Sequence, residues 1–273
     1  MYFITFSEML GTHGKKIARQ TASALNYTYF GEEELHKAAK EMGFFSDVKE
    51  LDERSPNFLE KFFSERPRIH LDRLQSVIYE VAQKGNTVFF GRGSQLMLSS
   101  FGCALHVLVT GSLEKRIQRV MEEHGVGREV AEKMIEKSDH DRGGFIRFAF
   151  NEDWLNPKLY DLVLNTDKLS LQSGVDLVLS SAKSDEIKAC GIDSVAQLGK
   201  LSLHRKVESG LLEAGLASSH VFVSVEDFDT VRLYGFTYSP EEKNEVDSVV
   251  KRVGNVKKIV NDLQVLQGNL TGA

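Results

Sequence analysis

The residues with the clearest chemical potential form a short glycine turn near the start of the chain. Gly11 and Gly14 follow an alternating apolar run that ends at Phe6, and a helical pattern begins directly behind them. Glycine lets backbone N–H groups approach a ligand closely, and the free amides and positive dipole end of a helix attract oxyanions. Lys15 and Lys16 follow Gly14, whereas the common phosphate loop ends in lysine and then serine or threonine. The turn therefore indicates either a phosphate site with an unusual ending or an ordinary surface turn before an amphipathic helix.

A second candidate is Arg92, which stands between Gly91 and Gly93 directly after the apolar run 87–90. The planar guanidinium group of arginine matches the oxygens of a monophosphate in a two-pronged hydrogen bond. The alternative is an arginine in a solvent-exposed turn.

A third candidate is the charged and aromatic segment 139–150, for which we expect a loop. It contains Asp139, Arg142 and Arg147. Arginines on a closing lid neutralise the charge of a phosphoryl group in transfer. A solvated charged loop is the simpler interpretation of the same composition.

Strand and helix patterns alternate through the first two thirds of the chain, which favours crossover units and a mainly parallel sheet. Strands are expected at 2–6, 27–30, 87–90, 105–109 and 160–165, and helices at 14–25, 32–42, 71–81, 113–123, 130–137 and 169–179. Ligands of such sheets bind at the carboxyl ends of the strands. The loops after Phe6, Phe90 and Val109 are therefore the expected location of a site.

The pattern weakens after residue 183 and then changes. We expect a first domain at 1–183, a linker or connecting helix at 184–198, and a small α+β domain at 199–273 in the order α-β-β-α-β.

The composition limits the possible functions. The 273 residues are 41% hydrophobic and 27% charged with a net charge of −5, so no overall attraction to nucleic acid is expected. No stretch approaches the roughly 20 apolar residues of a membrane helix, and no signal segment is recognisable at the start, so we expect a cytoplasmic protein. The two cysteines match no metal spacing and no metal ligands are assigned; Cys103 is expected to be a buried free thiol.

Four motifs in this order resemble the cytidylate kinase-like family of P-loop nucleoside monophosphate kinases, over residues 1 to about 182. They read I-T-F-S…G-T-H-G-K-K-I-A-R, F-F-G-R-G-S, D-H-D-R…R-F and W-L-N-P-K-L-Y-D-L-V-L-N-T. The resemblance implies an α/β fold, with a P-loop NTPase-type parallel sheet flanked by helices, a monophosphate-binding insertion and a lid. It also implies transfer of a phosphoryl group from ATP, with Mg²⁺, to a nucleoside monophosphate such as CMP or dCMP.

The resemblance also implies a role for each matching residue. Phosphate and nucleotide binding falls to Gly11, Thr12, His13, Gly14, Lys15, Lys16, Arg92 and Asp139, and catalysis to Lys15, Arg142 and Arg147. Gly14 stands where better-known relatives have the phosphate-binding lysine, and Lys16 stands at the Mg²⁺-binding hydroxyl. A nucleotide-binding sensor that does not transfer phosphate is therefore an alternative.

Residues from about 199 to 267 resemble a BON domain. The resemblance rests on V-R-L-Y-G-F-T-Y-S, the acidic helix after it, and V-G-N-V-K-K-I-V-N-D-L-Q-V. It implies a regulatory or interaction module with a phospholipid or protein ligand. A third hypothesis makes this module the functional part, docking the chain on a membrane or a partner.

Overall fold

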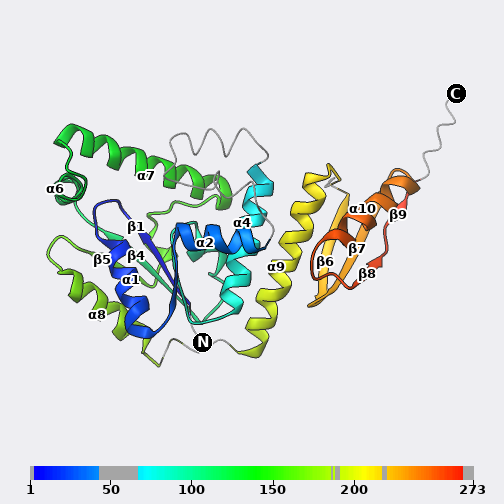
Figure 1. Ribbon diagram of the computed structural model, residues 1–273, viewed down its shortest axis with the longest axis horizontal. Helices are drawn as coiled ribbons and strands as arrows, with labels where there is room; N and C mark the ends of the chain where they lie inside the picture. Colours follow the sequence, from blue (N-terminus) through cyan, green and yellow to red (C-terminus); the bar gives the residue numbers. More distant parts are fainter. Residues whose placement is uncertain (1–2, 43–66, 186, 188–190, 217–219, 267–273) are drawn as a thin grey trace. The chain divides into compact units, whose positions relative to one another are not determined.

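The computed structural model describes residues 3–42, 67–185, 187, 191–216 and 220–266 (Figure 1). The chain divides into two compact units. One unit comprises Met1–Ser64 and Lys84–Gly191, and the other comprises Glu65–Gln83 and Ile192–Ala273. Residues 43–66, a part of the expected monophosphate-binding insertion, lie outside the described residues.

A five-stranded parallel sheet forms the centre of the first unit, as the strand–helix alternation predicts. Its order is β2-β3-β1-β4-β5, with β2 at Thr28–Phe30, β3 at Thr87–Phe90, β1 at Phe3–Glu8, β4 at Ala104–Thr110 and β5 at Leu162–Asn165. Because β1 is central, the loop that follows it opens between β3 and β4 at the carboxyl edge, where ligands of parallel sheets bind.

Helices cover this sheet (Figure 1). Helix α1 (Gly14–Leu25) and helix α8 (Leu171–Ala182) pack side by side on one face. Their apolar side chains meet alternate strand residues such as Ile4 and Phe6, because side chains along a strand alternate between faces. The remaining described helices of the unit are α2 (Glu32–Glu41), α5 (Ser94–Met97), α6 (Leu113–His124), α7 (Arg128–Phe150) and the 3₁₀ turn η1 (Pro157–Leu159).

Helix α7 corrects the expectation of a loop over 139–150, because the helix continues without a break to Phe150. Ile135, Phe145 and Ile146 are buried at spacings that fall on one helical face. Gly143 lies within this helix, and a Cβ atom there would be 3.3 Å from the indole nitrogen of Trp154. Gly143 thus permits a close contact with Trp154.

The second unit contains a small sheet covered on one face by helices. Its elements are α4 (Pro67–Gln83), α9 (Ile192–Glu213), β6 (Val221–Asp227), β7 (Thr230–Thr237), α10 (Pro240–Arg252), β8 (Lys258–Asn261) and β9 (Gln264–Val265). Strands β6 and β7 form an antiparallel pair, and β8 and β9 each pair parallel to β7. Valine and leucine side chains of α9, α10, β6 and β7 form the core.

Helix α9 pairs with α4 within this unit. Ser202 donates a hydrogen bond to the carbonyl of Ser76 at 3.0 Å, and Arg205 lies 3.1 Å from Asp72. Helix α9 begins at Ile192, so it includes the second half of the expected linker. Residues 67–83, expected in the first domain, group with the second unit.

Two further observations bear on the expectations from the sequence. No helix in the described ranges is long and apolar enough to cross a membrane. Cys103 is buried and disulfide-bonded, so the expectation of a free thiol is wrong. The other cysteine of the chain, Cys190, lies outside the described residues.

Candidate functional site

The glycine turn after β1 is tightly wound and leads straight into α1. Gly11 has a φ of +85°, and a Cβ atom there would be 2.7 Å from the carbonyl oxygen of Arg116, so only glycine fits. His13 also adopts a left-handed conformation, with φ 61°, and α1 begins at the next residue. The hydroxyl of Thr12 donates to the carbonyl of Met9 at 2.8 Å. The turn therefore presents the first amides of α1 at the carboxyl edge of the sheet.

Two arginines one helical turn apart on α6 hold this loop, and the sequence reasoning missed both. The Nε of Arg116 donates to the carbonyl of Leu10 at 2.8 Å. Arg119 donates to the hydroxyl of Thr166 at 2.9 Å and to its carbonyl at 2.6 Å. The Thr166 hydroxyl in turn lies 3.2 Å from the carbonyl of Thr12. The conformation of the loop is thus fixed by α6 and by the loop after β5.

His13 is partly buried in the same loop. Burial lowers the pKa of its imidazole, and the nearby charges of Lys16 and Arg119 lower it further. A neutral imidazole is therefore favoured at neutral pH, and His13 adds no positive charge to the loop.

Glu8, the last residue of β1, was missed by the sequence reasoning. It shares the face of β1 that α1 covers, and its residue is 5% exposed. Its Oε2 accepts the backbone N–H of Lys15 at 3.0 Å. A Cβ atom on Gly14 would be 2.6 Å from the Cβ of Glu8. The carboxylate therefore fills the space beside the head of α1.

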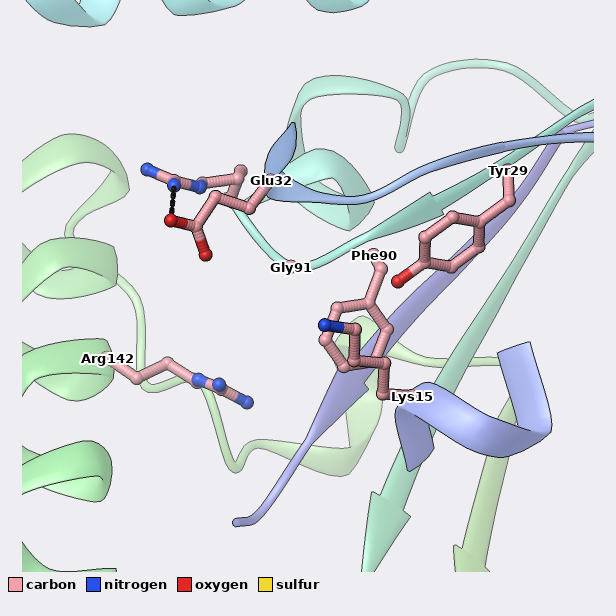
Figure 2. Close-up of a pocket in the computed structure, with 7 residues that line it drawn as sticks. Lys15, Tyr29, Glu32, Phe90, Gly91 and Arg142 are labelled. Carbon is pink, nitrogen blue, oxygen red and sulfur yellow. Dashed lines mark ion pairs between the residues drawn. The ribbon is translucent and has the colours of Figure 1, made fainter. Parts of the chain in front are cut away.

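A pocket opens next to this loop (Figure 2). It is lined by Lys15, Tyr29, Glu32, Phe90, Gly91, Arg92 and Arg142. Figure 2 shows Lys15 from α1 and Arg142 from α7 pointing toward the same space, with the Tyr29 hydroxyl on a third side. The lining contains three cations, Lys15, Arg92 and Arg142, and one carboxylate, Glu32. The net positive charge of these side chains favours the binding of an anion.

Arg92 holds a special backbone position in this pocket. Gly91, Arg92 and Gly93 have φ values of 74°, 62° and 71°, so three consecutive residues are left-handed. Left-handed backbone is unfavourable for arginine, and such strain concentrates at functional sites. Arg92 is 6% exposed and one guanidinium nitrogen lies 3.9 Å from Glu32. The turn after β3 therefore fixes this guanidinium in a buried position.

Arg142 and Tyr29 complete the pocket wall. The Arg142 guanidinium lies 5.3 Å from the ring centroid of Trp154, and that of Arg19 lies 4.6 Å from the ring of Tyr29. Burial raises the pKa of Tyr29 to about 12 although Arg19 opposes the shift. Tyr29 therefore stays protonated and offers a hydroxyl donor.

The structure gathers some of the predicted site residues and places others elsewhere. Lys15, Arg92 and Arg142 line one pocket, beside the glycine turn. Lys16 is exposed and pairs with Glu123 at 3.3 Å. The remaining predicted residues, Asp139 and Arg147, both lie on α7: the first makes a two-pronged bond to Arg116 at 2.8 and 2.9 Å, and the second is exposed.

The described residues do not fit a protein-held Mg²⁺ site. They contain no group of three or more metal-ligating side chains. Lys16, in the first turn of α1, carries a positive charge that disfavours a metal ion beside it. Mg²⁺ is commonly bound through substrate phosphates and water, with few protein ligands.

Comparison with known proteins agrees with this geometry. The model of the cytidylate kinase-like family matches residues 3–168, and that of the BON domain matches residues 202–267. Cytidylate kinase from Methanocaldococcus jannaschii is 29% identical over 185 residues, which cover 66% of this chain and 96% of that enzyme. The crystal structure of an uncharacterized protein from Eubacterium ventriosum superposes with a TM-score of 0.55 at 20% identity, covering 67% of this chain and 99% of that one. The chain therefore belongs to the cytidylate kinase-like family, and a BON domain follows its kinase-like region.

Proposed function

We propose that this chain is a kinase that transfers the γ-phosphoryl group of ATP to a nucleoside monophosphate, with CMP or dCMP as the expected acceptor. The proposal is carried by one observation: Lys15, Arg92 and Arg142 line a single pocket beside the glycine turn. The curated relative named cytidylate kinase supports the choice of acceptor. The cytoplasmic location remains a prediction.

Each cation has a distinct role in this proposal. Arg92, buried and fixed by its left-handed turn, grips the acceptor phosphate. Lys15 and Arg142 approach from α1 and α7 and stabilise negative charge on the phosphoryl group in transfer, which is the main protein contribution in this chemistry. ATP binds with its phosphates at the glycine turn and brings Mg²⁺ with it.

A coupled assay of ADP formation with CMP, dCMP, UMP, AMP and GMP tests the proposal. Removing one such cation lowers kcat by roughly 100-fold or more, and we expect this for Lys15→Ala and for Arg92→Ala. Lys16→Ala is the matched control, because Lys16 is the neighbouring lysine on the same helix and its exposed pair with Glu123 contributes little. Absence of turnover with every monophosphate, or equal loss in the two lysine variants, refutes the proposal.

A nucleotide sensor without transfer activity is the second candidate. The observation that favours it is Glu8, whose carboxylate lies against Gly14 at the position of the usual phosphate-binding lysine. Calorimetry that finds ATP or CMP binding, combined with no ADP formation, would support the sensor. Absence of nucleotide affinity would exclude it.

The BON domain presents an exposed aromatic pair on the sheet face opposite its helices. The rings of Phe222 and Tyr234 stack with centroids 5.5 Å apart and are 49% and 43% exposed. This pair is consistent with the predicted docking role toward a phospholipid or a protein. Flotation of the full chain with phospholipid vesicles tests the lipid alternative, and a chain that stays in the soluble fraction argues against it.

A further inference from the structure

A buried carboxylate lies where the proposed site would receive phosphate. Glu8 is 5% exposed, and its Oε2 accepts the amide hydrogen of Lys15, in the first turn of α1, at 3.0 Å. A buried charge is costly unless it is hydrogen-bonded. The free amides and the positive dipole end of a helix supply what a carboxylate needs. The head of α1 thus already holds an anion, and that anion belongs to the chain.

The same amide is part of the machinery by which a glycine turn binds phosphate. Helix N-termini bind oxyanions through the amides of their first turn. The Lys15 amide has one hydrogen, so it serves either Glu8 or a phosphate oxygen in a good hydrogen bond. A Cβ atom on Gly14 would lie 2.6 Å from the Cβ and 2.8 Å from the Oε2 of Glu8. Glu8 therefore competes for the amide and fills the space beside Gly14.

We infer that Glu8 is an internal competitor of the nucleotide polyphosphate. Nucleotide binds at this turn only after the carboxylate leaves the Lys15 amide, and this exchange determines the affinity. The inference rests on the proposed function, because it takes the glycine turn to be the ATP site. It adds a residue that sets how tightly the site binds nucleotide.

The size of the effect follows from the type of bond. A hydrogen bond to a charged group contributes roughly 1.5–3 kcal/mol, or about 10- to 100-fold in an equilibrium constant. Removing the charge of Glu8 should therefore tighten ATP binding by about 10- to 100-fold. Glu8→Gln keeps the size of the side chain and an oxygen acceptor, whereas Glu8→Ala removes the competitor altogether.

Calorimetric titration of the full chain with Mg-ATP tests this inference. Both variants should bind ATP more tightly than the wild type. Glu33→Gln, which removes the charge of an exposed glutamate on α2, should leave the affinity unchanged. ATP binding by the wild type with no tightening in either variant overturns the role of Glu8 alone. No ATP binding in any of the proteins overturns the proposed function as well.

A measurement on the wild type covers the case in which the variants fail to fold. The amide ¹H–¹⁵N resonance of Lys15 should shift as ATP displaces Glu8, and the amides of α10 in the BON domain serve as a reference. A Lys15 amide that stays unshifted at saturating ATP, while other residues of the glycine turn respond, overturns the exchange.

Discussion

Asp72 on α4 is predicted to make the stability of this protein fall as the pH rises from 4 to 7. Asp72 is 8% exposed and lies 3.1 Å from Arg205 of α9. Burial raises the pKa of its carboxyl from 3.8 to about 6. Arg205 and His204 oppose the shift and Glu208 adds to it. Burial therefore outweighs the ion pair.

The sign and size follow from proton linkage. Between pH 3.8 and about pH 6, the folded chain keeps a proton on Asp72 that the unfolded chain has released. Because the folded state then binds more protons, the free energy of unfolding falls as the pH rises through this window. The pKa of Asp72 differs by about two between the folded and unfolded chain, and each pKa unit is worth about 1.4 kcal/mol. The free energy of unfolding therefore falls by about 3 kcal/mol across the whole window. Well below pH 3.8 the contribution of Asp72 to the free energy of unfolding is fully present, and well above pH 6 it is fully lost.

Asp72→Asn isolates this effect because it keeps the shape of the side chain and removes its titration. Urea unfolding followed by circular dichroism at pH 4, 5, 6 and 7 gives the stability of both proteins. The variant should gain about 2.4 kcal/mol relative to the wild type between pH 4 and pH 7, because part of the full effect is already lost at pH 4. Asp193→Asn, at an exposed site on α9, should show no such gain.

The result that would refute the reasoning is a constant difference between Asp72→Asn and the wild type across the four pH values. A relative gain of the wild type with rising pH would also refute it, because the attraction of Arg205 would then exceed the effect of burial.

Three further predictions concern single positions. Asp139→Asn removes the charged partner of buried Arg116 and should lower the unfolding free energy by about 3 kcal/mol. A loss below about 1 kcal/mol in urea titrations would contradict a structural role for this pair. Gly11→Ala requires a left-handed alanine with its Cβ 2.7 Å from a carbonyl oxygen, and it should lower the free energy of unfolding by more than about 2 kcal/mol. Gly127→Ala is the control, because a Cβ there would meet nothing within 4 Å. Thermal melts should show a lower midpoint for the first variant and an unchanged one for the second. Ser239→Ala removes the side chain that caps α10 and should cost about 1 kcal/mol, and an unchanged unfolding midpoint would show that the cap is dispensable.

The sequence predicted the strand–helix alternation well because each element carries its own apolar period. It failed at α7, where charged and aromatic residues suggested a loop. The helix persists there because Phe145 and Ile146 are buried and because Gly143 packs against Trp154. Local composition does not reveal such packing contacts.

Helix α9 shows the same limit in the second unit. Its first residues, from Ile192, were expected to be a linker or connecting helix. The pairing of α9 with α4 depends on charged and hydroxyl side chains, such as Arg205 with Asp72 and Ser202 with Ser76. Residues more than a hundred positions apart give no periodic signal of their contact.

The candidate site was predictable to the extent that strand ends define it. Arg92 follows β3 and Lys15 follows the turn after β1, so a parallel sheet brings them to one edge. Successive residues of a helix point about 100° apart, which is why Lys15 lines the pocket and Lys16 pairs with Glu123 outside it. The roles of Asp139 and Arg147 stay predictions, since neither lines the described pocket.

The glycine at position 14, at the end of the glycine turn, has a physical explanation that involves a second residue, Glu8. Any side chain at Gly14 would begin 2.6 Å from the Cβ of Glu8, a separation that real Cβ atoms do not show. The carboxylate at the end of β1 and the missing side chain at the head of α1 are therefore one coupled feature. A lysine at position 14 would require a smaller residue at position 8, so a side chain can be introduced at this turn only if the two positions change together.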